Sequence, residues 1–422
     1  MKVLVVGGGG REHAIIKKLR ENPEITQLFA LPATGGMPDD AVCVPIGATD
    51  VPAITEFAKK ESIDFAVVTP DDPLALGCVD ALEDAGIPSF GPRKNAAIIE
   101  SSKAFSKELM AKYHIPTAAY EIFTDLDKAL DYVSSCPIPT VVKADGLALG
   151  KGVVIAQTRE EAAAAVRSMM EDKVFGDSGS RVVIEEFLEG PEVSVLSFTD
   201  GETVIPMVSS MDHKRAGDND TGLNTGGMGT IAPNPYYTPA VAQRCMEEIF
   251  LPTIRAMKDE GRTFRGCLYF GLMITKDGPK VIEYNCRFGD PETQVVLPLL
   301  KSDLLTIFRA VRDGKLAETP VEFSDGAACC VVLASQGYPG KYEKGYPITL
   351  PETVDHEAIY IAGASRDESG VLRTNGGRVL GAVATAGDLQ SAVTAAYALA
   401  DRIHFENAYC RRDIGRRALQ AL

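Results

Sequence analysis

Short apolar runs alternate with amphipathic stretches along the first hundred residues. Runs that are apolar throughout, such as residues 2–6 and 65–69, are typical of strands buried on both faces of a parallel sheet. The pattern predicts strands at residues 2–6, 27–31, 41–45, 65–69 and 89–90, and helices at 12–21, 51–60 and 74–85. We therefore expect an α/β fold that begins with a doubly wound parallel sheet, whose ligands bind beyond the carboxyl ends of its strands.

The remaining sequence indicates two further units of the α+β kind. The pattern there predicts helices at residues 103–113, 160–170, about 304–311 and 389–403, and strands at 140–143, 153–156, 181–186, 328–334, 359–362 and 378–386. A polar stretch with Gly and Pro, residues 313–326, is interpreted as a linker. The predicted domains are 1–101, then 102–312 with a small lobe at about 122–190, and finally 327–422.

Composition narrows the class of protein. The 422 residues carry a net charge of −15, which argues against broad binding to nucleic acid or anionic membranes. No apolar run reaches the roughly 18 residues of a membrane span, and the chain starts directly with an expected strand, which predicts no signal peptide. Nine cysteines without a Cys-x-x-Cys pair favour a reduced, cytoplasmic enzyme, with Cys329 and Cys330 as core residues. We expect small-molecule substrates, and a monomer or weak homodimer.

The most informative segment is residues 281–294. An apolar pair precedes Glu283 and Asn285, and a spacing of two on a strand puts both side chains on one face. Their oxygens suit Mg²⁺ (or Mn²⁺), which binds few protein ligands and keeps other positions for water and phosphates. Arg287 reaches the same side and offers a planar fork to a carboxylate or phosphate. The alternative is a strand that runs into a charged surface turn.

The first strand is followed by Gly7-Gly-Gly-Gly-Arg-Glu-His13, a glycine turn at the start of a helix. It fails the dinucleotide fingerprint, because Glu12 or His13 stands where the third glycine belongs. Free N–H groups at a helix N-terminus favour a phosphate, and Arg11 lies beside them. We therefore predict phosphate binding at this turn, with a purely structural tight turn as the alternative.

A second glycine-rich loop, Lys143-Ala-Asp-Gly-Leu-Ala-Leu-Gly-Lys-Gly152, follows a strand. It is only loosely similar to a P-loop, because no Gly-Lys-Ser/Thr opens a helix. The layout suits a hairpin flap that closes over a triphosphate, with Lys143 and Lys151 supplying positive charge. A surface hairpin without function is the alternative.

Two more segments are candidates. In residues 185–192, backbone groups can read an adenine edge while apolar side chains pack the ring, and Glu192 can accept ribose hydroxyls; taken alone the signal is weak. Residues 212–215 and 221–229 form a loop dense in donors and glycines, and long internal loops are commonly functional. Lys214 and Arg215 can hold phosphate, Asp212 can meet an ammonium group or accept a proton, and His213 is as suited to packing as to reaction.

Taken in order, these segments resemble the ATP-grasp carboxylate–amine ligases, and among them the phosphoribosylamine–glycine ligase family. The resemblance rests on residues 8–14, 143–152, 184–188, 212–215, 225–229, 287–294, 374–380 and 410–415, and it spans nearly the whole chain. Arg-Phe-Gly-Asp-Pro-Glu-Thr-Gln at 287–294 is its most specific part. Two departures stand out: Tyr269-Phe-Gly-Leu272 holds no acid where related ligases carry a further metal ligand, and Thr69-Pro-Asp71 replaces Gly-Pro-Glu.

The resemblance implies ATP-dependent ligation of glycine to phosphoribosylamine through an acyl phosphate, in purine biosynthesis. It implies Mg²⁺ or Mn²⁺ on Glu283 and Asn285, and Arg287 as the group that grips the carboxylate. Either Asp212 or Asp290 would hold the ammonium group or take the amine proton. ATP would contact Lys103, Lys143, Gly150, Lys151, Gly152, Glu185, Glu186, Phe187, Leu188 and Glu192. The other substrates would contact Gly8, Gly9, Gly10, Arg11, Glu12, Asp71, Lys214, Arg215, Asn224, Thr225, Gly226 and Gly227.

Three rival functions remain open from the sequence. An ATP-grasp ligase or carboxylase with another acceptor would keep the fold but lack the 287–294 string. An NAD-dependent oxidoreductase is suggested only by the first glycine turn, and the missing third glycine counts against it. A non-catalytic nucleotide-binding protein would bind ATP without glycine-dependent ADP release.

Overall fold

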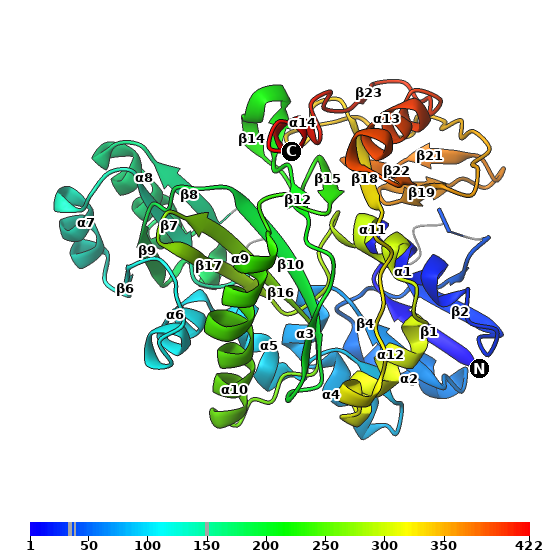
Figure 1. Cartoon of the computed structure of the whole chain (residues 1–422), viewed down its shortest axis with the longest axis horizontal. Helices are drawn as coiled ribbons and strands as arrows, with labels where there is room; N and C mark the ends of the chain where they lie inside the picture. Colours follow the sequence, from blue (N-terminus) through cyan, green and yellow to red (C-terminus); the bar gives the residue numbers. More distant parts are fainter. Residues whose placement is uncertain (33–35, 38, 148–151) are drawn as a thin grey trace.

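A computed structural model describes residues 1–32, 36–37, 39–147 and 152–422 of the chain (Figure 1). At the N-terminus, parallel strands form a sheet in the order β3-β2-β1-β4-β5. The strands are β1 (Lys2–Val6), β2 (Gln27–Leu31), β3 (Val42–Cys43), β4 (Phe65–Val68) and β5 (Ser89–Phe90). The predicted doubly wound parallel sheet is therefore confirmed. Strand order reverses between β1 and β4, and the glycine turn at the carboxyl end of β1 lies at this switch point.

Both faces of this sheet are buried, which explains its continuous apolar strands. Leu4 and Val6 pack into one core, whereas Val3 and Val5 pack into a second core on the opposite face. The surrounding helices are α1 (Gly10–Leu19), α2 (Val51–Lys60), α3 (Asp71–Leu76), α4 (Cys78–Asp84) and α5 (Lys94–Ser101). The single helix expected at 74–85 is wrong: Gly77 adopts a left-handed conformation, with φ of +88°, and divides it into α3 and α4.

A small lobe follows α6 (Lys103–Lys112). Its antiparallel sheet has the order β6-β9-β7-β8, and two helices cover it. A compact apolar core that includes Val142, Ile184 and Met169 joins sheet and helices. The elements are β6 (Tyr120–Phe123), α7 (Leu126–Ser135), β7 (Thr140–Ala144), β8 (Val153–Ala156), α8 (Arg159–Met170) and β9 (Val182–Glu186).

A second antiparallel sheet, in the order β11-β10-β16-β17, lies beside the small lobe (Figure 1). Its strands are β10 (Glu192–Thr199), β11 (Val204–Pro206), β16 (Gly266–Thr275) and β17 (Gly278–Asn285). A helical stretch packs against it through Phe250, whose ring centroid lies 4.2 Å from that of Phe270. This stretch comprises α9 (Pro239–Cys245), a π-helix (Met246–Phe250) and α10 (Leu251–Asp259).

A third antiparallel sheet, called the third sheet below, combines strands from both sides of residues 313–326. Its order is β12-β15-β18-β22-β19, and β23 pairs with β18. The strands are β12 (Met211–Asp212), β15 (Gly229–Ala232), β18 (Ala327–Ser335), β19 (Glu357–Ile361), β22 (Arg378–Ala386) and β23 (Ala408–Tyr409), and α13 (Leu389–Ala400) covers the sheet. Strands β12 and β15 thus connect the central part of the chain to its C-terminal sheet.

The remaining elements are short connections. They comprise two hairpins and three helices. They are β13 (Arg215–Gly217) with β14 (Thr221–Asn224), β20 (Ala364–Arg366) with β21 (Leu372–Thr374), α11 (Thr293–Val296), α12 (Leu304–Asp313) and α14 (Arg416–Leu419). Short 3-10 turns occupy Gly176–Gly179, Asp218–Asp220, Leu297–Leu299 and Leu316–Glu318. Within the described ranges, no helix has the length and apolar character needed to cross a lipid bilayer.

An aromatic cluster joins the N-terminal sheet to the second antiparallel sheet. The ring of Phe308, on α12, stacks on Phe90 of β5 with 3.9 Å between centroids. Phe198 of β10 and Phe288 lie edge-on to Phe308, and all four rings are buried. Because these residues come from distant parts of the chain, their shared core fixes how the N-terminal sheet sits against the candidate site.

This packing leads to a stability prediction. We expect Phe308→Ala to lower the free energy of unfolding by about 3–5 kcal/mol, because it opens a cavity in a fully buried cluster. Urea denaturation followed by circular dichroism measures the change. The matched control is Leu223→Ala, where the side chain is 65% exposed and a change within about 0.5 kcal/mol is expected. Equal stability of Phe308→Ala and the wild-type protein would contradict the proposed role of the cluster.

Candidate active site

The strand pair β16–β17 carries Glu283 and Asn285 on one face, as their spacing predicts. Glu283 pairs with Gly271, and Asn285 pairs with Tyr269. Between Glu283 and Val281 the register shifts by one residue, so Ile282 stands as a bulge. The Ile282 carbonyl accepts a hydrogen bond from Lys143 Nζ at 3.0 Å. The bulge thereby ties the small lobe, which provides Lys143, to the strand that carries the two oxygen donors.

Lys143 belongs to a buried charge cluster with Glu185 and Lys107. Glu185 on β9 lies 3.0 Å from Lys143 Nζ and 3.1 Å from Lys107 Nζ, with all three side chains at most 4% exposed. The first contact is an ion pair without hydrogen-bond geometry. Lys107 also donates to Thr117 Oγ1 at 2.7 Å. Burial lowers the pKa of Lys107 to about 8, although Glu185 acts in the opposite direction.

Cationic side chains surround Glu283. Burial opposes its ionisation, but the charges of Lys214, Lys143, Lys103 and Arg287 outweigh burial and lower the pKa of Glu283. Glu283 is therefore an anion, as a metal ligand must be. Among the described residues, no group of three or more His, Cys, Asp or Glu side chains is placed to hold a metal ion. A divalent cation at Glu283 and Asn285 would thus depend on oxygens from phosphate and water.

Arg287 is anchored from the N-terminal unit. Its Nη2 lies 3.2 Å from Glu100 Oε1, on α5, and 3.4 Å from Asn285 Oδ1. Glu100 also accepts the Cys286 N–H at 2.8 Å. Arg287 Nε is buried and has no hydrogen-bond partner within the described ranges. Since an unpaired buried donor is costly, this N–H is suited to an oxygen of a bound ligand.

The glycine turn after β1 abuts the end of the 287–294 segment. Arg11 Nη1 donates to the Phe288 carbonyl at 3.0 Å. A Cβ atom at Gly9 would lie 3.5 Å from Asp290 Oδ2, and one at Gly10 would lie 2.7 Å from Gln294 Nε2. The structure thus brings together two motifs that are almost three hundred residues apart.

The N–H groups of this turn were expected to be free, but the Gly9 N–H is not. Glu12, three residues into α1, reaches back and accepts the Gly9 N–H at 2.7 Å. Glu12 Oε1 also accepts from Thr69 Oγ1 at 2.7 Å and from Arg11 Nε at 2.6 Å. Glu12 therefore acts as a buried capping residue that holds the turn in shape.

Asp212 and Asp290 have opposite environments. Arg378 Nη2 lies 3.2 Å from Asp290 Oδ2, and Gln294 Nε2 donates to Asp290 Oδ1 at 2.7 Å. Burial raises the pKa of Asp290, but Arg378, Arg11 and the Gln294 hydrogen bond reverse this and lower it. The pKa of Asp212 is raised by burial and by the charge of Glu292, with Lys214 and Arg378 offsetting only part of the effect. Asp212 therefore holds a proton more readily than Asp290.

The other predicted residues have the following contacts and positions. Lys103 Nζ donates to the Gly146 carbonyl at 2.9 Å, and Lys214 lies 3.5 Å from Glu192. Glu186 turns away, since it accepts from Ala119 N and Lys280. Phe187 and Leu188 are half-buried beyond β9, and Asp71 begins α3. The β13–β14 hairpin carries Arg215 and Asn224, and the Thr225–Gly227 turn follows it. In the other loop, the Gly152 carbonyl accepts the Ala144 N–H. Gly150 and Lys151 lie outside the described residues.

Sequence reasoning missed four residues that hold the site. Glu100 and Lys107 pair with predicted residues, Arg378 binds Asp290, and Tyr269 donates to Glu292 at 3.1 Å. None belongs to a local motif with the residue it contacts. The only signal was the Gly-Gly-Arg sequence ending at Arg378, which is part of a segment that carried the family resemblance. His213, left open between packing and reaction, packs: its ring accepts the Gly415 N–H.

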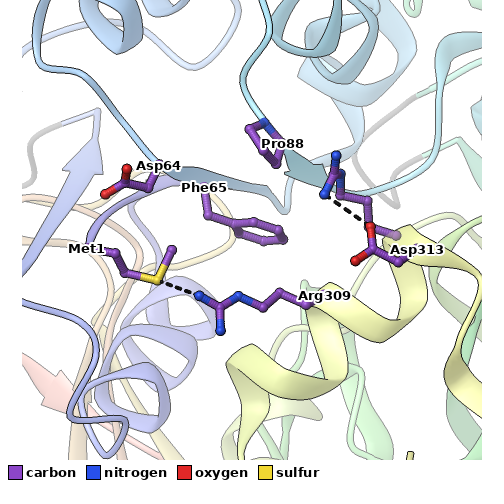
Figure 2. Close-up of a pocket in the computed structure, with 7 residues that line it drawn as sticks. Met1, Asp64, Phe65, Pro88, Arg309 and Asp313 are labelled. Atoms are coloured by element: carbon purple, nitrogen blue, oxygen red, sulfur yellow. Dashed lines mark hydrogen bonds and ion pairs between the residues drawn. The ribbon is translucent and has the colours of Figure 1, made fainter. Parts of the chain in front are cut away.

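A separate pocket of about 370 Å³ lies away from these residues (Figure 2). Met1, Asp64, Phe65 and Pro88 line it at the amino ends of β1, β4 and β5, with Arg309 opposite. Ligands of doubly wound sheets bind at the carboxyl ends, and its charges of both signs do not select one ligand class. We therefore assign the chemistry to the face around Glu283, and not to this pocket.

Comparisons with known proteins agree with the geometry. Family models for phosphoribosylglycinamide synthetase match the chain in three parts: the N domain at residues 1–100, the ATP-grasp (A) domain at 101–293 and the C domain at 328–417. A protein from Halalkalibacterium halodurans named phosphoribosylamine–glycine ligase is 48% identical over 99% of this chain and 97% of its own length. One from Escherichia coli O6:H1 with the same name is 47% identical, covering 100% of this chain and 99% of that protein.

Solved structures give the same picture. The crystal structure of phosphoribosylamine–glycine ligase from Thermotoga maritima is similar, with a TM-score of 0.86 and 35% identity over 98% of this chain and 100% of that one. The biotin carboxylase domain of Hydrogenobacter thermophilus 2-oxoglutarate carboxylase has a TM-score of 0.73 at 18% identity, covering 97% of this chain and 91% of that one. At this identity the second likeness shows a shared fold alone.

The charge cluster of Lys107, Glu185 and Lys143 leads to a pH prediction. Lys107 is charged below a pKa of about 8 and neutral above it, so the net charge of the cluster falls from +1 to 0 as pH rises through 8. We expect the affinity for a nucleoside triphosphate to fall about threefold to tenfold over this range. The Lys107→Met variant should bind the nucleoside triphosphate more weakly than the wild-type protein at pH 7, and its affinity should no longer depend on pH in this range. Titration calorimetry between pH 7 and 9.5 measures both effects.

The matched control is Lys112→Met, on the same helix, whose side chain is 63% exposed and pairs with Glu260. This variant should keep the wild-type affinity and its pH dependence. Identical pH profiles for the wild-type protein and Lys107→Met would contradict the role of the cluster.

Proposed function

The chain belongs to the phosphoribosylglycinamide synthetase family, and we propose how its residues divide the work of the reaction. The protein is an ATP-dependent carboxylate–amine ligase of purine biosynthesis. It joins glycine to 5-phosphoribosylamine, and the products are glycinamide ribonucleotide, ADP and phosphate. The observation that carries the assignment of roles is that Lys143 and Arg287 reach the strand of Glu283, at the Ile282 carbonyl and at Asn285. The charges of Lys103 and Lys214 also act on Glu283.

The first half of the reaction activates a poor acylating agent. A glycine carboxylate oxygen attacks the γ-phosphorus of ATP, the bond to the β-phosphate oxygen breaks, and glycyl phosphate and ADP form. We assign Lys143 and Lys103 to the charge of the triphosphate, and Arg287 to the glycine carboxylate and then the acyl phosphate. Residues 185–188 would contact adenine, and Glu192 the ribose.

Glu283 and Asn285 would hold Mg²⁺ or Mn²⁺, because they place one anionic and one neutral oxygen donor on the same face of β17. Bound there, the cation supplies charge neutralisation and orientation for the phosphate oxygens. The absence of an acid at Gly271, which pairs directly with Glu283, supports a site completed by phosphate and water.

In the second half of the reaction, the amine of phosphoribosylamine attacks the glycyl carbonyl carbon. The bond between that carbon and the bridging phosphate oxygen breaks, phosphate leaves, and the nitrogen loses one proton. We assign the proton, or the ammonium group of glycine, to Asp212, because Asp290 is already held by Arg378 and Gln294. We assign the ribose phosphate to the turn at Gly8–Arg11 and to Asp71. The predicted 145–152 loop would exclude water from glycyl phosphate, and its residues 148–151 lie outside the described residues.

The proposal also covers the oligomeric state, the cellular environment and the domains of the enzyme. We propose an active monomer or weak homodimer. The nine free cysteines support a reduced, cytoplasmic environment. The proposed domains remain 1–101, 102–312 and 327–422, and strands β12 and β15 of the central part add to the C-terminal sheet.

The activity itself is tested by ADP release. We expect ADP to form only when Mg²⁺, glycine and freshly generated phosphoribosylamine are all present, and addition of EDTA should stop it. A coupled assay for ADP, run beside controls that lack either substrate, measures this. Turnover no higher than in these controls would contradict the function.

The metal assignment is tested at Glu283. Glu283→Gln removes the negative charge with little change in volume, so we expect kcat to fall by about 10²-fold or more while the fold is retained. Steady-state kinetics and circular dichroism measure the two properties. Glu248→Gln is the control, since this partly exposed residue pairs with Arg244 in the helical stretch. Near-normal kcat in Glu283→Gln would refute the assignment.

A further inference from the structure

We propose that Arg378 and Tyr338, both in the C-terminal part of the chain, are positioning residues that hold the Gly226 peptide and the Asp290 turn for amide formation. Both lie outside the residues that contact substrates in the proposed function. The inference rests on that proposed function, because it concerns the loops that carry Asp212 and Asp290. It adds a role for the third sheet, in which β18 pairs with β15 on one side and with β22 on the other (Figure 1).

Arg378, the first residue of β22, binds three backbone carbonyls and one carboxylate. Its Nη1 donates to Gly226 O at 2.7 Å, to Asp290 O at 2.9 Å and more weakly to Gly227 O at 3.5 Å. Its Nη2 lies 3.2 Å from Asp290 Oδ2. The planar guanidinium thus joins the 225–227 turn to the 290 turn, a geometry that an ammonium group cannot reproduce.

Tyr338 holds the same residue, Gly226, from its other side. Its hydroxyl accepts the Gly226 N–H at 3.1 Å, while Arg378 binds the Gly226 carbonyl. Tyr409 donates to the Tyr338 carbonyl at 3.0 Å and secures the turn that carries the ring. Both polar groups of residue 226 are therefore fixed by the C-terminal part of the chain.

Three glycines make this arrangement possible. A Cβ atom at Gly226 would lie 2.9 Å from the guanidinium carbon of Arg378, and one at Gly377 would overlap the ring of Tyr338. Gly227 has φ of +115°, and a Cβ atom there would lie 2.6 Å from Asp212 Oδ1. Gly226, Gly227 and Gly377 thus serve one contact between two segments that are distant in sequence.

Asp212 is affected through this contact. Gly227 packs directly on its carboxylate, so a shift of the 225–227 turn changes the space around Asp212. The residues assigned to the triphosphate, Lys103 and Lys143, belong to α6 and β7 and touch neither Arg378 nor Tyr338 among the contacts described. Loss of the contacts made by Arg378 and Tyr338 should therefore impair the binding of glycine and phosphoribosylamine. It should leave nucleotide binding intact.

The experiment compares Arg378→Met, Arg378→Lys and Tyr338→Phe with the wild-type enzyme. We expect Arg378→Met to raise the KM for glycine and phosphoribosylamine and to lower kcat/KM about 10- to 100-fold, since misplacement near 1 Å has effects of this size. The ratio of ADP to glycinamide ribonucleotide should rise above one, because misaligned glycyl phosphate is lost to water. Arg378→Lys should recover part of kcat/KM by pairing with Asp290.

Tyr338→Phe removes one hydrogen bond and little volume, so it stays interpretable if Arg378→Met fails to fold. We expect about a threefold to tenfold rise in the KM for glycine. The dissociation constant for ATP should remain at the wild-type value in each folded variant. The control is Arg373→Lys, which lies on β21 and pairs with Asp367; its kinetic constants should not change.

Unchanged KM values and a product ratio of one in folded Arg378→Met, or in Tyr338→Phe, would overturn the inference. A uniform loss of active enzyme, with KM and product ratio unchanged, would show a merely structural role and would also overturn it. If the wild-type enzyme itself released no ADP, the proposed function would fail first, so the two failures are distinguishable.

Discussion

The contact on which the site depends is the hydrogen bond from the Lys143 ammonium group to the carbonyl of Ile282. It connects a strand of the small lobe to a strand of the neighbouring sheet, and it exists because a bulge takes Ile282 out of the regular ladder. A buried lysine also needs an anion, and Glu185 supplies it while sharing its charge with Lys107. The same contact therefore sets the distance between the lobes and places positive charge opposite Glu283.

The sequence predicts the structure correctly where neighbouring residues determine the geometry. The parallel sheet follows from short strands that are apolar throughout, and Leu4 and Val5 confirm that both faces are buried. The common face of Glu283 and Asn285 follows from their spacing of two, because the bulge at Ile282 lies before the pair and does not change their alternation. In each case a few neighbouring residues determine the geometry.

The wrong predictions and the missed residues have physical causes of two kinds. Gly77 interrupts an expected helix, and Glu12 takes an N–H group expected to be free, because single side chains or a glycine overrode a regular pattern. Glu100, Lys107 and Arg378 were missed for another reason. Each meets its partner only after distant segments have packed, and periodicity along the chain carries no information about such pairs.

These long-range contacts divide the site into two parts with different supports. The nucleotide side depends on buried charges between the small lobe and β17, all within residues 102–312. The amide-forming side gathers the glycine turn after β1, the Asp290 turn and the Gly226 peptide, and so depends on the N-terminal and C-terminal sheets as well. The contacts that support the nucleotide side thus differ from those that support the amide-forming side. They also explain why β12 and β15 leave the central part of the chain to join β18: the sheet that continues into the C-terminal part is what carries Asp212 to its place.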